Sequence, residues 1–233
     1  MDRTQLEATF DRQAGAYDQQ WARLAPLQEA LHLLLASVFA DLPTDARLLC
    51  VGAGTGAEIE RLAARFPAWT FVAVEPSAQM VELGRAKAQE RGYAARCRFH
   101  HGYLESLPDG DPFDGATSLL VSQFLLDAGE RTGFFRAIAE RLKPRGLLAS
   151  ADLAGELRSP GGGQLLALWM RTMAGAAVPA QRAEQMRQAY ARDVAILPPG
   201  EVAAVIGAAG FAAPVAFFQA SLLHAWYAER RAS

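Results

Sequence analysis

The sequence predicts an α/β protein built on a doubly wound, mostly parallel sheet. Strand-like and helix-like segments alternate between residues 47 and 153 with short turns, a pattern typical of parallel strands joined by helices. The first strand, RLLCV at 47–51, continues as an unbroken apolar run after Arg47, as expected when helices cover both faces of a sheet. The segment 214–230 predicts two strands close together, so an antiparallel C-terminal hairpin brings the sheet to seven strands.

Each expected element has a local signal. Leucines recur at helical spacing in the first part of the chain and predict N-terminal helices over 1–45. Ser77 is placed to cap a helix over 77–92, and Pro144 is expected to stop a helix over 130–146. The expected parallel strands are 47–51, 69–75, 96–102, 113–122 and 147–153.

A different pattern follows the fifth strand. Residues 155–197 predict two helices and no strand, with a break at SPGGGQ (159–164). The segment 165–176 is apolar nearly all round, so it must cover something: it is either a substrate lid or a subunit interface. A helix over 198–211 then returns to the sheet pattern. We expect a single domain over 1–233, as a monomer or homodimer.

Composition and charge exclude several classes of function. The chain has 233 residues, 51% hydrophobic and 21% charged, and its net charge of −2 does not favour nucleic acid or an anionic membrane as a partner. Its start lacks the apolar core of a signal peptide, and the apolar run 30–42 is too short to span a bilayer. Cys50 and Cys97 fall in expected strands, which favours reduced thiols in a cytoplasmic protein, and no metal site is expected.

A glycine-rich turn joins the first strand to the next helix. The stretch LLCVGAGTGAEIERLA (48–63) contains Gly52, Gly54 and Gly56, and such turns usually receive a nucleotide-like ligand. Glu75 ends the second strand, where a carboxylate suits a ribose diol and disfavours a 2′-phosphate. The turn has no lysine and needs none for a ligand without phosphate.

A dinucleotide oxidoreductase is one hypothesis for this turn. Gly52, Gly54 and Ala57 match a loosened dinucleotide fingerprint, and Glu75 lies at about the right distance. Three features count against it: the long helical segment before the first strand, the lack of a Tyr-x-x-x-Lys pair, and the antiparallel ending.

Five motifs in register resemble those of the class I S-adenosylmethionine (SAM)-dependent methyltransferases of small molecules. They are VGAGTG, VAVEPSAQM, FHHGYLESLP, FDGATSLLVSQFL and LKPRGLLASADL, and the resemblance extends over about residues 10 to 154 and to the hairpin ending. It implies a Rossmann-like sheet and SAM as the cofactor. The cofactor-binding residues that it implies are Tyr17, Gly52, Ala53, Gly54, Gly56, Glu75, Pro76, Met80, Tyr103, Leu104 and Val121.

One position departs from the family pattern. Tyr103 stands where relatives carry an acid for the adenine amine, so either Glu105 replaces that acid or the backbone at Tyr103 and Leu104 holds the adenine edge. Arg12 or Arg23 is a candidate for the SAM carboxylate, with surface solvation as the alternative.

The residues that contact the acceptor are less clearly marked. The candidates for substrate binding are Trp21, Gln123 and Trp169. Packing within the protein is the simpler interpretation for the aromatic and methionine side chains in these regions, namely Trp21, Phe124, Trp169, Met170, Met173 and Tyr190. His100 and His101 are candidates for a general base but also for ordinary strand-end residues, and Asp127 and Asp152 for substrate contacts or turn caps. No catalytic residue is assigned, because methyl transfer from a sulfonium mainly requires an acceptor held in line.

The expected reaction is methyl transfer to an oxygen, nitrogen or carbon of a small-molecule acceptor. Two alternatives remain: an enzyme similar to the carboxy-SAM synthases, which share the helical insertion, and a SAM-binding interaction protein without turnover, which the missing acid at Tyr103 favours.

Overall fold

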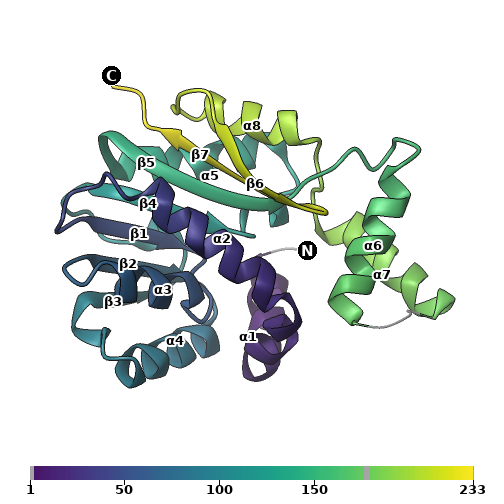
Figure 1. The fold of residues 1–233 in the computed structure, drawn as a ribbon, viewed down its shortest axis with the longest axis horizontal. Helices are drawn as coiled ribbons and strands as arrows, with labels where there is room; N and C mark the ends of the chain where they lie inside the picture. The colour runs from purple at the N-terminus through teal and green to yellow at the C-terminus, as the bar shows by residue number, and fades with distance from the viewer. Residues whose placement is uncertain (1–2, 176–178, 233) are drawn as a thin grey trace.

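The computed structural model describes residues 3–175 and 179–232, which form one sheet with helices on both faces (Figure 1). Within these ranges the sheet has seven strands in the order β3-β2-β1-β4-β5-β7-β6. The first five run parallel, and β7 runs antiparallel to both β5 and β6. The predicted mostly parallel sheet with a C-terminal hairpin is thereby confirmed. The strands are β1 (Arg47–Val51), β2 (Thr70–Glu75), β3 (Cys97–His101), β4 (Phe113–Leu119), β5 (Leu142–Leu153), β6 (Val215–Ala220) and β7 (Leu223–Glu229).

The helices follow the predicted order along the chain. A 3-10 turn at Ala22–Leu24 separates the two N-terminal helices, and Ser77 caps α4 by accepting from the Met80 N–H. The α-helices are α1 (Arg3–Trp21), α2 (Ala25–Val38), α3 (Ala57–Arg65), α4 (Ala78–Glu90), α5 (Ala128–Arg141), α6 (Gly162–Ala174), α7 (Ala180–Asp193) and α8 (Pro199–Ala208). No helix of the described residues is long and apolar enough to cross a membrane.

Two apolar layers hold the helices on the sheet. On one face, β1 and β2 pack against α2, α3 and α4 through a cluster that includes Leu35, Ile59 and Ala88. On the other face, α5 and α8 pack through Phe135 and Ile206. Because both faces are covered, β1 has no polar side, as its sequence predicts.

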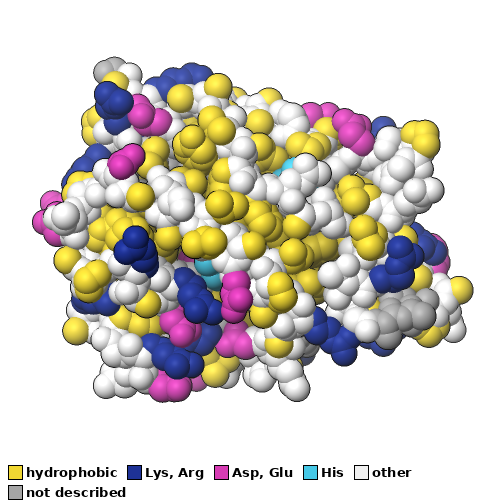
Figure 2. Space-filling view, viewed as in Figure 1, with side chains coloured by type: hydrophobic (Ala, Val, Ile, Leu, Met, Phe, Trp, Pro, Cys, Tyr) yellow, Lys and Arg dark blue, Asp and Glu magenta, His cyan; other side chains and the backbone are white. Residues whose placement is uncertain are grey.

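A third cluster holds α6 at one end of the sheet. Leu166, Trp169 and Met170 of α6 pack with Leu24 and Leu222. In Figure 1, α6 and α7 stand together at this end, away from α3 and α4. Figure 2 shows apolar side chains across the middle of the displayed face and charged ones gathered near α3 and α4. The insertion is therefore packed on the domain mainly through α6, since no described residue of α7 is buried.

Two boundaries differ from the sequence prediction. The expected helix 130–146 ends at Arg141, and β5 begins at Leu142. Pro144 does not prevent this because the ladder shifts there: Phe113 pairs with Leu142, and Gly115 next pairs with Leu147, so the residues between form a bulge.

The second difference is the end of the fourth strand. The predicted strand 113–122 stops at Leu119, because Leu120 adopts φ of 61° and a 3-10 turn follows at Ser122–Phe124. The chain therefore leaves the sheet at the carboxyl end of β4, where the candidate site lies.

Candidate functional site

A cavity of about 710 Å³ opens at the carboxyl ends of β1, β2 and β4. The strand order reverses between β1 and β4, and doubly wound sheets bind ligands at this point. Six segments line the cavity: α1 (Arg3, Leu6, Phe10, Tyr17), the glycine turn (Val51, Gly52, Gly54), the end of β2 and the start of α4 (Val74, Glu75, Pro76, Met80), the segment after β3 (Gly102, Tyr103, Leu104, Glu105), the segment at the end of β4 (Leu119, Leu120, Val121, Phe124, Leu125) and α5 (Glu130, Gly133, Phe134, Ala137).

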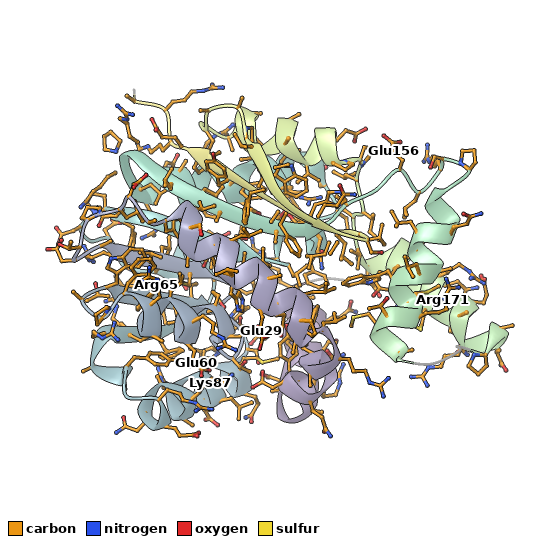
Figure 3. All side chains as sticks on the ribbon, in the orientation of Figure 1. Glu29, Glu60, Arg65, Lys87, Glu156 and Arg171 are labelled. Carbon is orange, nitrogen blue, oxygen red and sulfur yellow. The ribbon has the colours of Figure 1, made fainter. Side chains whose placement is uncertain are left out.

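A separate hollow of about 550 Å³ lies between α2 and α3. It is lined by Glu29, His32 and Arg65 among others, and Figure 3 shows where Glu29 and Arg65 lie. None of the residues predicted to bind cofactor or substrate lines this hollow, so the candidate site is the cavity at the strand ends.

The glycine turn has the backbone shape that only glycine adopts readily. Gly52, Gly54 and Gly56 have φ of 69°, 53° and 76°. A Cβ on Gly52 would lie 2.3 Å from Val121 Cγ2, so Val121 packs directly on the turn. A Cβ on Gly54 would meet nothing within 4 Å and would project into open space. The turn therefore presents bare backbone to the cavity.

Glu75 braces the turn from the neighbouring strand. Its Oε2 accepts from the Gly54 N–H and its Oε1 from the Ser77 N–H, both at 2.9 Å. The side chain is only 5% exposed, and burial raises the pKa of its carboxyl against these two hydrogen bonds. Each oxygen keeps a further acceptor position that can serve a ligand hydroxyl.

Helix α1 covers the cavity with one face. Phe10 and Tyr17 are seven residues apart, two helical turns, and their rings meet edge to face at 6.4 Å. Phe10 also contacts Phe124 at 5.6 Å between ring centroids. Burial, together with Glu75 and Glu58, raises the pKa of Tyr17, so its phenol stays protonated.

Polar contacts at the edge of that face fix α1 to the rest of the domain. Asp11 accepts from the Ser77 hydroxyl at 2.5 Å, at the start of α4. Asp18 accepts from the Thr55 hydroxyl at 2.7 Å and forms an ion pair with Lys87 at 2.8 Å. Lys87, labelled in Figure 3, comes from the opposite end of α4. The whole length of α1 is thus held over the strand ends.

The segment after β3 closes another side of the cavity. The Tyr103 hydroxyl donates to the Arg3 carbonyl, and the Arg3 guanidinium lies 4.7 Å from the Tyr103 ring centroid. Glu105, which also lines the cavity, pairs with Arg3 at 2.9 Å. His100 contacts Ser106 and His101 contacts the Pro76 carbonyl, and neither histidine is among the lining residues.

Behind the segment that ends β4 lies a buried polar network. Asp152 accepts from the Ser122 hydroxyl at 2.6 Å and from the Gln123 N–H at 2.9 Å, and it pairs with Arg131 at 3.2 Å. Burial raises the pKa of Asp152, which Arg131 and the two donors oppose. The Gln123 side chain accepts from the Leu153 N–H at 2.7 Å. Gln123 and Asp152 are therefore bonded to protein groups, outside the set of residues that line the cavity.

The remaining predicted residues also have protein partners. Asp127 caps α5 by accepting from the Glu130 N–H. The Trp169 indole, 1% exposed, donates to the Tyr190 hydroxyl at 2.9 Å. Arg12 and Arg23 bond to Thr9 and to the Ala174 carbonyl.

The cavity brings together most, but not all, of the predicted site residues. No described residue of α6 or α7 lines it, and the lid or interface function of 155–197 stays a prediction. The residues that line it are Tyr17, Gly52, Gly54, Glu75, Pro76, Met80, Tyr103, Leu104 and Val121; those that lie outside it are Ala53, Gly56, Trp21, Gln123 and Trp169.

Sequence reasoning missed several residues of the site. Leu6 and Phe10 lie on the cavity face of α1, and their helical spacing from Tyr17 would have found them. Glu58, in the first turn of α3, does not line the cavity but is close enough to act on Tyr17; it is 8% exposed, and burial raises the pKa of its carboxyl to about 7. The pairing of Arg131 with Asp152 has no local signal, because the two residues meet only through the fold.

Comparisons with known proteins agree with this geometry. Residues 48–146 match the model of the methyltransferase domain family. The chain is 32% identical over 146 residues to the biotin biosynthesis bifunctional protein BioHC of Teredinibacter turnerae, which covers 59% of this chain and 25% of that protein. It is 36% identical over 117 residues to the erythromycin 3''-O-methyltransferase of Saccharopolyspora erythraea, covering 49% and 37%. The chain thus spans well under half the length of either curated relative.

A solved structure shares the fold. A putative O-methyltransferase from Nostoc punctiforme superposes with a TM-score of 0.68 at 16% identity, over 94% of this chain and 59% of that one. The family match at 48–146 contains the glycine turn, Glu75 and the segments after β3 and β4 that line the cavity. Residues 48–146 therefore match a methyltransferase domain, and these findings together support a class I SAM-dependent methyltransferase.

Proposed function

We propose that the chain binds SAM in the cavity and transfers its methyl group to an oxygen, nitrogen or carbon of a small-molecule acceptor. The observation that carries the proposal is the Glu75 carboxylate, buried in the cavity with both oxygens fixed by the Gly54 and Ser77 N–H groups. A carboxylate held in this way suits two adjacent ribose hydroxyls and repels a 2′-phosphate.

The other lining residues fit the rest of that cofactor. Gly54 leaves open space beside bare backbone for the methionine part, and Gly52 allows Val121 to pack against the turn. Met80 and Leu104 offer apolar surface for the adenine ring. When bound, SAM supplies a methyl group on a sulfonium, which is a good leaving group.

The chain's own residues bind, orient and exclude water. Phe10, Tyr17 and Phe124 form an apolar cover, and aromatic rings attract a cation. Tyr17 is a hydroxyl donor at neutral pH, as any tyrosine is, and its raised pKa keeps it protonated at higher pH as well. Holding the acceptor in line in a cavity closed to water is the main catalytic requirement.

Cavity size and one relative support a small acceptor. A volume of about 710 Å³ lies in the range of small-molecule sites. The erythromycin 3''-O-methyltransferase, which aligns with half of this chain, carries the name of an oxygen-methylating enzyme.

Calorimetry with SAM, S-adenosylhomocysteine and NADP tests the cofactor. We expect binding of the first two and none of NADP, with Glu75→Gln weakening the affinity at least tenfold. Glu130→Gln is the matched control, because Glu130 lines the cavity from α5 and is expected to change affinity less than threefold. NADP binding without SAM binding would overturn the proposal.

Labelled SAM with metabolite extracts tests the reaction. Labelled small-molecule product is the expected result. SAM binding without product from any extract would favour an interaction protein without turnover, and carboxy-SAM in the purified protein, seen by mass spectrometry, would favour the synthase-like alternative.

A further inference from the structure

We propose that the buried pair Arg131–Asp152 is a positioning device: it holds the segment 120–125 as a wall of the cofactor cavity and fixes the exit of the helical insertion to that wall. The two side chains are 1% and 0% exposed and lie 3.2 Å apart. The part of the test that measures S-adenosylhomocysteine affinity rests on the proposed function.

The first half of the argument concerns the cavity wall. Asp152, in β5, accepts from the Ser122 hydroxyl and the Gln123 N–H, and Arg131 Nε donates to the same Ser122 oxygen at 2.9 Å. Leu120 to Leu125 leave the sheet through a non-glycine residue at positive φ, which the surrounding structure must hold in place. Val121 and Phe124, on either side of the bonded residues, line the cavity.

The second half concerns the insertion. Ala195, two residues after α7, donates its N–H to the Gln123 carbonyl at 2.7 Å and accepts from Arg131 at 3.2 Å. Beside it, the Gly155 N–H donates to the Leu197 carbonyl at 2.9 Å, which joins the entrance of the insertion to its exit. Both ends of 155–197 are therefore anchored next to the wall that carries Val121.

The full burial of both charges restricts the pair to a single geometry. A buried carboxylate or guanidinium that loses its partner is strongly unfavourable, so the pair keeps one geometry. That geometry sets where the wall lies against Gly52, since the Val121 side chain packs on the Gly52 backbone with no room for a methyl group.

A matched control exists at the amino end of β4, a central strand of the same sheet. Asp114 is 7% exposed, accepts from the Arg47 N–H at 2.9 Å and pairs with Lys143 at 2.7 Å. Asp114→Asn and Asp152→Asn make the same change in two buried, paired aspartates, of which only Asp152 contacts the segment that forms the cavity wall.

The experiment compares the two variants by hydrogen exchange and by calorimetry with S-adenosylhomocysteine. Both variants are expected to lower Tm. Only Asp152→Asn should raise exchange at 120–125 and 194–197 and weaken the affinity at least tenfold, whereas Asp114→Asn should leave both within twofold of the native chain. Native protection of both segments in Asp152→Asn, or equal losses in the two variants, would overturn the proposal.

A conservative variant separates the two contacts of Arg131 and covers the case in which Asp152→Asn fails to fold. Arg131→Lys keeps a cation for Asp152 but cannot also reach Ser122 and Ala195, so 194–197 should lose protection more than 120–125 does. Equal protection of both segments, at the native level, would contradict the anchoring. If the native chain does not bind S-adenosylhomocysteine, the proposed cofactor fails, and the exchange comparison still decides the positioning.

Discussion

Gly52 and Gly54 offer a direct test of how the glycine turn is built. Both have positive φ, 69° and 53°, so alanine at either position costs about 1–2 kcal/mol in backbone strain. They differ in space, because a Cβ at Gly52 would lie 2.3 Å from Val121 Cγ2, whereas one at Gly54 would meet nothing within 4 Å. Gly52→Ala should therefore carry an additional overpacking cost of about 1–3 kcal/mol.

The two costs sum to about 2–5 kcal/mol for Gly52→Ala and about 1–2 kcal/mol for Gly54→Ala. Both variants also restrict the unfolded chain, a stabilising effect of about 0.4–1 kcal/mol that is common to the two and cancels in the comparison. Urea unfolding at equilibrium measures the difference as a shift in midpoint at constant slope.

The variant Val121→Ala tests whether the overlap with the Val121 side chain is the cause of the extra cost at Gly52. Removing two methyl groups costs about 1.6 kcal/mol when buried, and less here because Val121 is partly exposed. In the double variant with Gly52→Ala that truncation also relieves the overlap, so the free energies should be non-additive by about 1–3 kcal/mol in the favourable direction. With Gly54→Ala the same truncation should be additive within about 0.5 kcal/mol.

Two results would refute this reasoning. One is equal destabilisation by Gly52→Ala and Gly54→Ala within about 0.5 kcal/mol, and the other is additivity of Gly52→Ala with Val121→Ala. The affinity for S-adenosylhomocysteine gives an independent test. Gly54→Ala adds a methyl group that projects into the cavity, so it should weaken binding even though it destabilises the fold only slightly.

Three further predictions follow from buried polar groups. Glu75→Ala should weaken SAM affinity by about ten- to hundredfold and also lower Tm, because it leaves the Gly54 and Ser77 N–H groups unpaired at about 1–3 kcal/mol each; an unchanged Kd in calorimetry would exclude Glu75 as the ribose ligand. Burial raises the pKa of Glu58 from 4.5 to about 7, so the native state binds the proton more tightly and stability should fall as pH rises from about 4.5 through about 7. Glu58→Gln should remove that slope and gain up to about 3 kcal/mol at pH 8 in urea unfolding, and an identical slope in the variant would contradict the assignment. Tyr190→Phe should cost about 1–3 kcal/mol, seen as a lower Tm, because it removes the acceptor of the buried Trp169 indole; a native Tm would mean that water replaces it.

Much of the fold could be predicted because its signals are local. The apolar strand 47–51 and the Ser77 cap depend only on neighbouring residues, and both are found where expected. The predicted helix 130–146 extends too far along the chain, because Pro144 lies in a bulge of β5 and does not mark the end of a helix. That bulge depends on pairing with β4, which a local pattern does not report.

The residues of the site also fall into those that the sequence reveals and those that only the fold reveals. The glycine turn and Glu75 are recognisable in the sequence because φ above zero requires glycine and because a strand-end carboxylate is conspicuous. The partners of Gln123, Asp152 and Trp169 are not recognisable, since they lie on other elements and satisfy these side chains within the protein.

The sequence by itself determined the order of strands and helices, the glycine turn and the carboxylate that faces it, because these follow from periodicity, backbone preference and position along one strand. Only the tertiary structure decided that α1 rather than the described part of 155–197 lines the cavity, and that Asp152 meets Arg131. The physical reason is that a helix face or a buried charge acquires its function from what packs against it. Here some of those partners lie a hundred or more residues away in the chain, as Tyr103 does from Arg3 and Ala174 from Arg23.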